Sequence, residues 1–271
     1  MMLELLTAIR FEKVMGSGRT QPCLLVCENE AGEEVEVVTK MRSHPQIMPG
    51  GLLAEAVASL LALDLDLPVQ TPYRIAIEKA FADTVPDAAL RAVIQKSEGL
   101  NFGCAKWAPG YTIWPRDKTP SREMRQSLME VFAFDGLIQN PDRRQTNPNC
   151  AFLGSNLLIF DHESAFSHFL SILPVAPWDA GGLAFLKDHI FFQALRGGNL
   201  ALDRFQGALE AIDGPRLDAY IAAVPAEWNG QTTTGQKIKT YLTECIANFQ
   251  RIRLQLEIGR ASCRERVSPY V

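Results

Sequence analysis

The first 77 residues carry an apolar pattern that predicts strands. Residues 23–27 and 35–39 are short runs of aliphatic and β-branched side chains, and a polar segment that contains Gly32 separates them. This combination predicts a β-hairpin. Residues 5–13 predict a strand before the hairpin, joined to it by a glycine-containing loop, and residues 71–77 alternate like a further strand.

The first helix is predicted over residues 52–65, where leucine and valine side chains recur at helical spacing. Asp66 follows directly, at a position where helices often end in a left-handed residue, and Asp tolerates that conformation better than most residues do. Residues 83–95 have a weaker helical pattern. Glycines, prolines and tryptophans within residues 99–115 predict a connecting segment.

The second half of the chain is mainly helical in pattern. Thr119 and Pro120 predict the start of a helix that runs to about residue 139, because threonine caps helices well and proline suits the first turn. A polar loop over residues 140–149 and a short hairpin over residues 151–160 follow. Further helices are predicted over residues 182–196, 201–212, 216–224 and 234–256.

This order of elements predicts an α+β protein of two lobes. We expect a β-rich N-lobe with one main helix (residues 1–98) and a mostly α-helical C-lobe (residues 99–257), with a cleft between them that favours ligand binding. Residues 258–271 resemble the translation of a widely used DNA-sequencing adaptor. We therefore predict that this tail is an artefact, and exclude it from the fold.

Composition narrows the class of protein. Of the 271 residues, 47% are hydrophobic and 21% are charged, which is typical of a globular protein with a sizeable core. The net charge of -4 and the lack of a Lys/Arg block disfavour nucleic acid as a direct partner. The sequence has no apolar run of about 18 residues and no secretory-signal pattern, so we expect a cytoplasmic protein without a membrane span. The six cysteines lack zinc-site spacing.

The candidate catalytic residues lie in the polar loop NPDRRQTNPN. Asp142 and Asn147 are five positions apart, as in kinase catalytic loops, and Asp161 ends the hairpin that follows. A carboxylate at the start of such a loop can hold an acceptor hydroxyl, and amide and carboxylate oxygens are ligands that Mg²⁺ prefers. Each residue alone is also compatible with turn or cap chemistry, and Asn149 is an alternative to Asn147 as the amide ligand.

The loop NPDRRQTNPN followed by LLIFDHESAF resembles the HipA-like kinases and, more distantly, the phosphatidylinositol-kinase-like folds. The N-terminal segments GSGRTQPCLLV, VEVVTK and LLAEAVASLLALDLDLPV follow that family's order. The resemblance covers about residues 11–166 and implies a protein-kinase-like fold.

The resemblance also implies roles for residues of the N-lobe. Lys40, at the end of the third strand, would contact the α- and β-phosphates of ATP, and Glu55 would pair with Lys40 and hold it in place. The loop of Gly16, Ser17 and Gly18 would close over the phosphates, since glycine lets backbone N–H groups approach closely. The alternatives are a solubilising charge for Lys40, an exposed helix residue for Glu55 and a plain turn for the glycine loop.

In the C-lobe, the resemblance implies that Asp142 is the catalytic base or orienting residue and that Asn147 and Asp161 hold Mg²⁺. Residues 99–107 would form the hinge near adenine. The sequence departs from the family's usual pattern at Glu163, where glycine often follows Asp-His. A carboxylate at this position could alter metal affinity or loop mobility.

The resulting expectation is an ATP-dependent phosphotransferase that moves the γ-phosphate of Mg-ATP to a hydroxyl, that of Ser or Thr in a protein. Glu163 and the short glycine loop leave room for a pseudokinase that binds nucleotide without turnover. A third alternative is an interaction protein that binds no nucleotide. The sequence does not identify the acceptor, which is an unknown protein or small molecule, or a regulatory partner.

Overall fold

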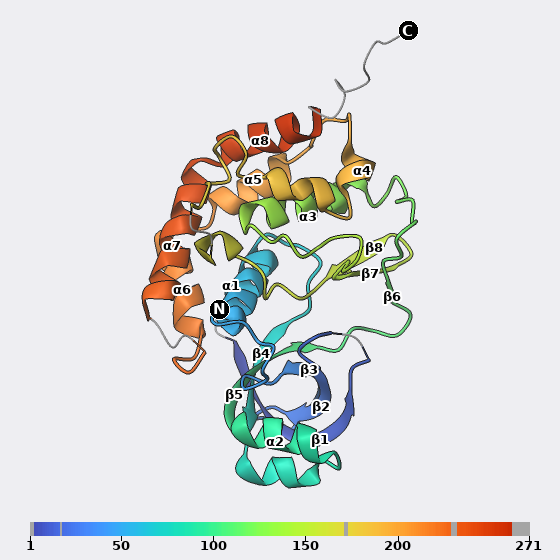
Figure 1. The fold of residues 1–271 in the computed structure, drawn as a ribbon, viewed down its shortest axis with the longest axis vertical. Helices are drawn as coiled ribbons and strands as arrows, with labels where there is room; N and C mark the ends of the chain where they lie inside the picture. The colour runs from blue at the N-terminus through green and yellow to red at the C-terminus, as the bar shows by residue number, and fades with distance from the viewer. Residues whose placement is uncertain (1–2, 17, 171–172, 229–231, 262–271) are drawn as a thin grey trace.

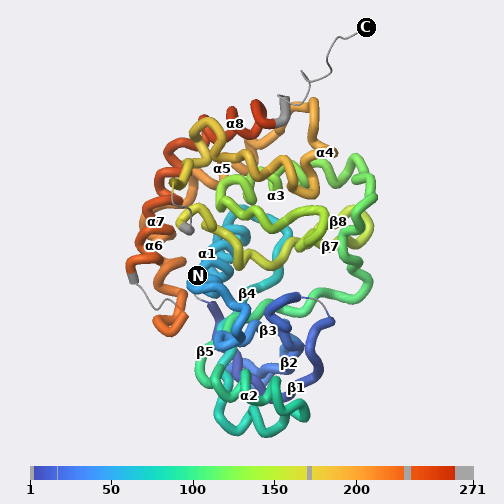
Figure 2. The backbone as a smooth tube through the Cα atoms, in the orientation of Figure 1, coloured from blue at the N-terminus to red at the C-terminus, as the bar shows by residue number. Residues whose placement is uncertain are grey.

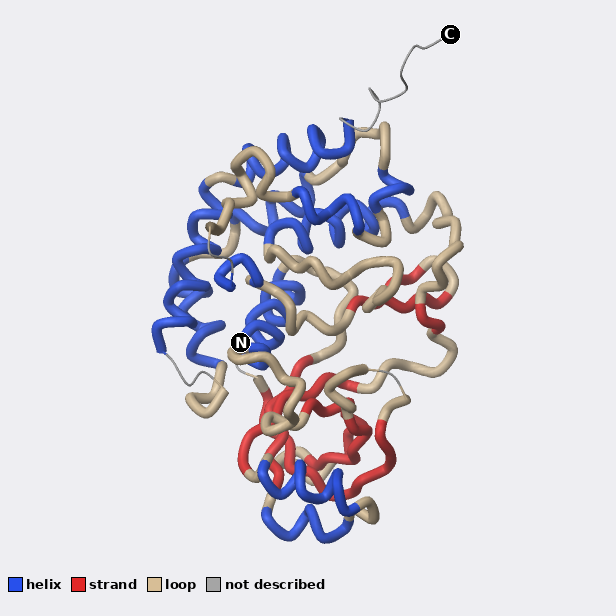
Figure 3. Tube along the Cα trace, in the orientation of Figure 1, coloured by secondary structure: helices blue, strands red, loops and turns tan. Residues whose placement is uncertain are grey.

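A closed five-stranded barrel and a helical part form the two main bodies of the chain in this computed structural model, which describes residues 3–16, 18–170, 173–228 and 232–261 (Figures 1 and 3). The strands follow one another around the barrel in the order β1-β2-β3-β5-β4. Their bounds are β1 Glu4–Val14, β2 Cys23–Glu28, β3 Glu34–Lys40, β4 Pro72–Ile77 and β5 Gly99–Ala105.

The barrel closes because β1 pairs with two strands, antiparallel with β2 and parallel with β4. Alternate side chains point inward and bury an apolar core that includes Leu6, Leu25 and Ile75. A 3-10 helix, η1 (Lys79–Thr84), and α2 (Ala88–Lys96) pack their apolar side chains on the same core.

The long helix α1 (Gly51–Asp64) is buried on all sides along most of its length. A helix that is apolar all round belongs inside a core, and α1 packs with the helical part although it lies between two barrel strands in sequence. In Figure 2 the light-blue tube of α1 lies among the green and orange segments. Asp66 has a φ of 53°, so the predicted left-handed residue after this helix is confirmed.

The helical part surrounds α3 and a small sheet. The sheet has the order β6-β7-β8, and Ile159 at the end of β8 also pairs with Val69, just after α1. The remaining elements are β6 Thr112–Ile113, α3 Arg125–Leu137, β7 Cys150–Leu153, β8 Asn156–Ile159, η2 Ser167–Leu170, η3 Ala184–Asp188, α4 Phe192–Leu195, α5 Asp203–Glu210, α6 Gly214–Ala223, α7 Thr232–Ala247 and α8 Phe249–Ala261.

The fold class predicted from the sequence is confirmed, with a β-rich N-terminal sheet followed by a mainly helical part. The division into lobes at residue 98 and the artefact tail stay predictions, and residues 262–271 of that tail lie outside the described residues. None of the helices in the described ranges combines the length and the apolar character needed to cross a membrane.

Residues 99–105, predicted as a connector, form β5 instead. The strand lies between β3 and β4 and completes the barrel. Gly103 is needed here because a Cβ at this position would lie 2.5 Å from Cγ1 of Val37 and 2.9 Å from Cγ1 of Ile75. The glycine that lowered the strand signal therefore marks a close approach inside the barrel.

Three predicted helices have different bounds in the structure. The helix predicted from Pro120 begins at Arg125, and the segment before it carries Lys118, whose ammonium lies 3.8 Å from the centre of the Phe152 ring. The helix predicted over residues 182–196 is interrupted, because Ile190 donates its N–H to the carbonyl of Arg143. Residues 234–256 divide at Asn248, whose side chain and backbone N–H both donate to the carbonyl of Glu244.

Candidate active site

Most of the predicted site residues lie on the wall of one cavity between the barrel and the helical part, whereas Asp142 does not line it and contacts the lining residue Asn147. The cavity has a volume of about 540 Å³, within the usual range of small-molecule sites, and its wall includes Lys40, Glu55, Asn147 and Asp161. Gly18 also lines it, with a φ of 111° that suits glycine.

Two members of the predicted glycine loop are not part of this wall as described. Gly16 has no atom within 4 Å of the place where a Cβ would stand, and it does not line the cavity. Ser17 lies outside the described residues. The phosphate-closing role of Gly16 and Ser17 therefore stays a prediction.

Lys40 joins the barrel to the helical part through ion pairs. Its Nζ lies 2.6 Å from Oε2 of Glu55 on α1 and 2.6 Å from Oδ1 of Asp161 after β8. The pairing of Lys40 with Glu55 that the family resemblance implied is confirmed. Glu55 also accepts a hydrogen bond from the backbone N–H of His162 at 2.9 Å, so its two carboxylate oxygens contact two different segments.

Burial and charge act in opposite directions on this ion pair. Burial favours the neutral form of Lys40, but the carboxylates around it outweigh that effect and hold its pKa well above the ordinary value. Burial would raise the pKa of Glu55, and Lys40 and His162 lower it instead. Both groups are therefore charged at neutral pH.

The loop between α3 and β7 presents Asp142 and Asn147 together. Nδ2 of Asn147 donates to Oδ2 of Asp142 at 2.8 Å. Reciprocal backbone hydrogen bonds between Arg144 and Asn147, of 3.0 and 2.9 Å, close the turn. The five-residue spacing thus brings the amide of Asn147 back onto the carboxylate of Asp142.

Asp142 is three-quarters buried, and its pKa is raised by this burial and by the negative charge of Asp161. Asp161 itself is about one-third exposed, at a φ of 59° that turns the chain directly after β8. This left-handed turn sets the carboxylate of Asp161 at the cavity wall, where Lys40 reaches it.

A buried polar cluster holds the loop that carries Asp142 and Asn147. Arg143 donates through Nε to Oδ2 of Asp135 on α3 at 2.6 Å, and His189 contacts the same oxygen at 2.9 Å. Asn140 donates to the other carboxylate oxygen at 3.0 Å. Burial would raise the pKa of Asp135, but Arg143 and His189 hold it below the ordinary value. Asp135 therefore ties α3 to the loop of residues 140–149.

Arg143 also donates to the backbone carbonyls of the two residues that flank the β7–β8 hairpin at its open end. Its Nη1 contacts the carbonyl of Asn149 and, at 3.3 Å, that of Phe160, the residue before Asp161. One arginine thus fixes the positions of Asp142 and Asp161 relative to each other. These contacts of Arg143 are all within the protein and are structural.

Three residues on the cavity wall carry buried polar atoms without a hydrogen-bond partner within the described part of the chain, namely Asn149, Gln70 and His162. Nδ2 of Asn149 is a buried donor, and Oε1 of Gln70 is a buried acceptor. Buried polar groups are normally satisfied, so these two atoms fit a ligand that carries donors and acceptors, such as a nucleotide. Gln70 was not predicted from the sequence, because no motif marks it.

The oxygen set of Asp142, Asn147 and Asp161 fits a hard divalent cation. Among the described residues, no group of three or more His, Cys, Asp and Glu side chains could hold a metal ion by itself. Mg²⁺ does not require such a group, because it usually takes one or two carboxylates together with substrate phosphates and water. The family-implied metal and the residues present are therefore compatible.

The sequence model of the HipA-like kinases matches residues 8–255, most of the chain. The chain belongs to the HipA-like kinase family. The match extends well beyond the segment of residues 11–166 on which the motifs resemble the family. No curated protein sequence matches this HipA-like kinase.

Two solved structures are similar to this chain. A Helicobacter pylori protein described as the proinflammatory kinase CtkA superposes with a TM-score of 0.53 at 13% sequence identity, over 94% of this chain and 97% of that one. The Golgi casein kinase with Mn/ADP bound is similar at a TM-score of 0.45 and 11% identity, over 97% of this chain and 73% of that one. The likeness to CtkA shows that this HipA-like kinase has a kinase fold.

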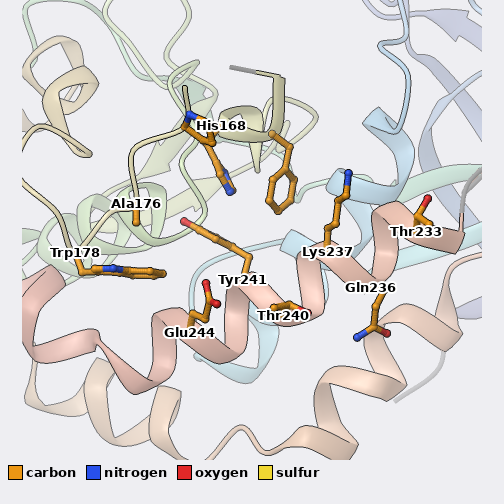
Figure 4. Close-up of a pocket in the computed structure, with 11 residues that line it drawn as sticks. His168, Ala176, Trp178, Thr233, Gln236, Lys237, Thr240, Tyr241 and Glu244 are labelled. Carbon is orange, nitrogen blue, oxygen red and sulfur yellow. The ribbon is translucent and has the colours of Figure 1, made fainter. Parts of the chain in front are cut away.

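A second pocket lies along α7, in the helical part (Figure 4). Trp178, Tyr241 and Glu244 contribute to its wall, and none of the predicted site residues does. The predicted site residues Lys40, Glu55, Asn147 and Asp161 line the cavity between the barrel and the helical part, and none of them lines the pocket along α7.

Proposed function

We propose that this HipA-like kinase transfers the γ-phosphate of Mg-ATP to a hydroxyl group, that of Ser or Thr in a protein. The observation that carries the proposal is the position of Lys40, 2.6 Å from both Glu55 and Asp161. A kinase needs this lysine near the phosphates and the metal-binding carboxylate beside it, and the two come from different parts of the chain.

Each side chain has a specific task in this proposal. Lys40 binds the α- and β-phosphates, and Glu55 holds its ammonium in place. Asp142 orients the acceptor hydroxyl and accepts its proton, and its raised pKa brings its basicity closer to that of a useful general base. Asn147 and Asp161 would hold Mg²⁺, which neutralises phosphate charge when it is bound.

The adenine end of ATP would lie against the end of β5. Cys104, Ala105 and Trp107 line the cavity there, and the Trp107 ring packs on that of Phe160 with centroids 5.1 Å apart. The unpartnered Nδ2 of Asn149 and Oε1 of Gln70 would supply hydrogen bonds to the nucleotide. This arrangement supports ATP as the ligand of the cavity.

A nucleotide-binding protein without turnover is the second candidate. The observation that favours it is that three carboxylates, those of Glu55, Asp161 and Glu163, surround Lys40. A lysine held by three anions is less available to phosphate than one held by a single glutamate. Mg-ATP binding without transfer would support this candidate.

The test is transfer of labelled γ-phosphate from Mg-ATP to the full chain itself and to a cell extract. Asp142→Ala and Asp161→Asn are compared with Asp188→Asn, an exposed aspartate on η3. We expect label with the parent and with Asp188→Asn, and none with the two site variants. Mg-dependent ATP binding without transfer would favour the second candidate, and no ATP binding would exclude both.

A further inference from the structure

Glu163 is a third carboxylate on Lys40, and it also contacts the start of α1. Its Oε2 lies 3.4 Å from Nζ of Lys40, while its Oε1 accepts the backbone N–H of Met48 at 3.0 Å. The side chain is only 7% exposed. One buried carboxylate therefore links the barrel, the segment that enters α1 and the loop that carries Asp161.

Gly51, the first residue of α1, is shaped to receive this side chain. A Cβ on Gly51 would stand 2.7 Å from Cγ of Glu163, closer than real Cβ contacts, and 3.1 Å from its Oε1. Because Gly51 has no Cβ, the side chain of Glu163 has room beside the first residue of α1 and accepts the N–H of Met48. Gly51 and Glu163, which are far apart in sequence, thus form a buried contact.

The three carboxylates on Lys40 differ in exposure. Asp161 is 35% exposed at the cavity wall, whereas Glu55 and Glu163 are 3% and 7% exposed. When the carboxylate of Asp161 serves a metal ion, the two buried glutamates remain as partners of the lysine. They reach it from two different segments, because Glu55 belongs to α1 and Glu163 to the loop after β8.

We infer that Glu163 is a positioning residue, which holds Lys40 and the start of α1 in the arrangement that binds the phosphates of ATP. This inference rests on the proposed function, since it assigns a task in nucleotide binding. Glu163 acts through Lys40 and through the Met48 N–H, and needs no contact with the nucleotide itself.

Two substitutions separate the charge of Glu163 from its hydrogen bond. Glu163→Gln can still accept the N–H of Met48 but loses the ion pair, and Glu163→Ala loses both. The dissociation constant and the KM for Mg-ATP should rise about tenfold in Glu163→Ala, the effect of one lost charged hydrogen bond, and by less in Glu163→Gln. The kcat should fall less than the KM rises, because Asp142 keeps its place.

The matched control is Glu130→Gln. Glu130 is a buried glutamate that pairs with Arg204 on the far side of α3 and lines no part of the nucleotide cavity. We expect this variant to lower the urea midpoint of unfolding and to leave the dissociation constant of Mg-ATP unchanged. If Glu163 had a purely structural role, Glu163→Ala would also lower the urea midpoint and leave the dissociation constant of Mg-ATP unchanged. That result would overturn the inference.

A second readout needs neither metal nor nucleotide. In the free protein, the urea midpoints of Lys40→Met, Glu163→Gln and the double variant form a cycle, and we expect the two losses not to add, because the residues share one ion pair. Additive losses would overturn the inference. If the parent protein binds no Mg-ATP, the proposed function itself is wrong. If the parent and Glu163→Ala bind Mg-ATP equally well, only the inferred role of Glu163 is wrong.

Discussion

Arg143 and Asp135 form an ion pair of 2.6 Å in which neither side chain exposes any surface. The pair ties the catalytic loop to α3, and His189 and Asn140 complete the hydrogen bonding of the carboxylate. A buried charge that keeps all its partners is tolerated in a protein core, whereas one that loses its partner is strongly destabilising.

Arg143→Met should therefore destabilise the protein by about 3–5 kcal/mol, because it leaves Asp135 buried without its cation. The measurement is urea unfolding followed by circular dichroism. Arg144→Met is the matched control, since the neighbouring arginine is 55% exposed and pairs with Asp142 at 3.4 Å. The control should change stability by no more than about 1 kcal/mol, as exposed ion pairs do. Equal losses in the two variants would contradict the structural role of Arg143.

Lys40→Met removes the cation shared by Glu55, Asp161 and Glu163. We expect a loss of about 3–5 kcal/mol in urea unfolding, since the buried carboxylates are left unpaired. Adding Glu55→Gln to this variant should restore part of the loss, because it removes the most buried of the three negative charges. A double variant that is less stable than Lys40→Met would show that the carboxylates do not repel one another as the geometry indicates.

Local patterns in the sequence were sufficient to predict the hairpin and the loop that brings Asp142 and Asn147 together. Each is a local feature in which function or turn formation needs particular residues at a fixed separation in sequence, as in the five positions from Asp142 to Asn147. The pairing of Lys40 with Glu55 was implied by the family resemblance and needed only the order of a strand and a helix.

Contacts between distant segments could not be predicted in the same way. The hydrogen bond from Met48 to Glu163 spans 115 positions, and nothing in the spacing of either residue indicates it. The sequence suggested that Glu163 could alter metal affinity or loop mobility, whereas the structure places it on Lys40. Strand β5 was missed for a related reason, because the tight packing around Gly103 depends on Val37 and Ile75.

Gly103→Ala tests that packing. The new Cβ would stand 2.5 Å from Cγ1 of Val37, so the variant should lose about 1–3 kcal/mol, the usual cost of overpacking a core. Gly207→Ala is the control, because Gly207 lies within α5 with no atom within 4 Å of its Cβ position. It should gain about 0.5–1 kcal/mol from helix propensity. Thermal unfolding measures both, and a stabilised Gly103→Ala would show that the barrel interior has room there.

His168 links the stability of the helical part to pH. Its ring packs between Phe169 and Tyr241, with centroids 3.9 and 4.2 Å away, and its Nδ1 has no hydrogen-bond partner in the described ranges. Burial lowers its pKa to about 4. In the unfolded chain a histidine has a pKa of about 6.5, so the unfolded state binds a proton first as the pH falls.

Between about pH 6.5 and pH 4 the unfolded state therefore gains protons that the folded state resists, and stability falls as the pH falls. His168→Phe keeps an aromatic ring and removes this titration, so its free energy of unfolding should drop less than that of the parent between pH 7 and pH 5. Urea unfolding at constant ionic strength measures both. His44 and His189, whose pKa values are also lowered, remain in both proteins, so the difference between the two slopes isolates His168. Identical slopes would mean that the ring of His168 accepts a proton in the folded protein as readily as in water.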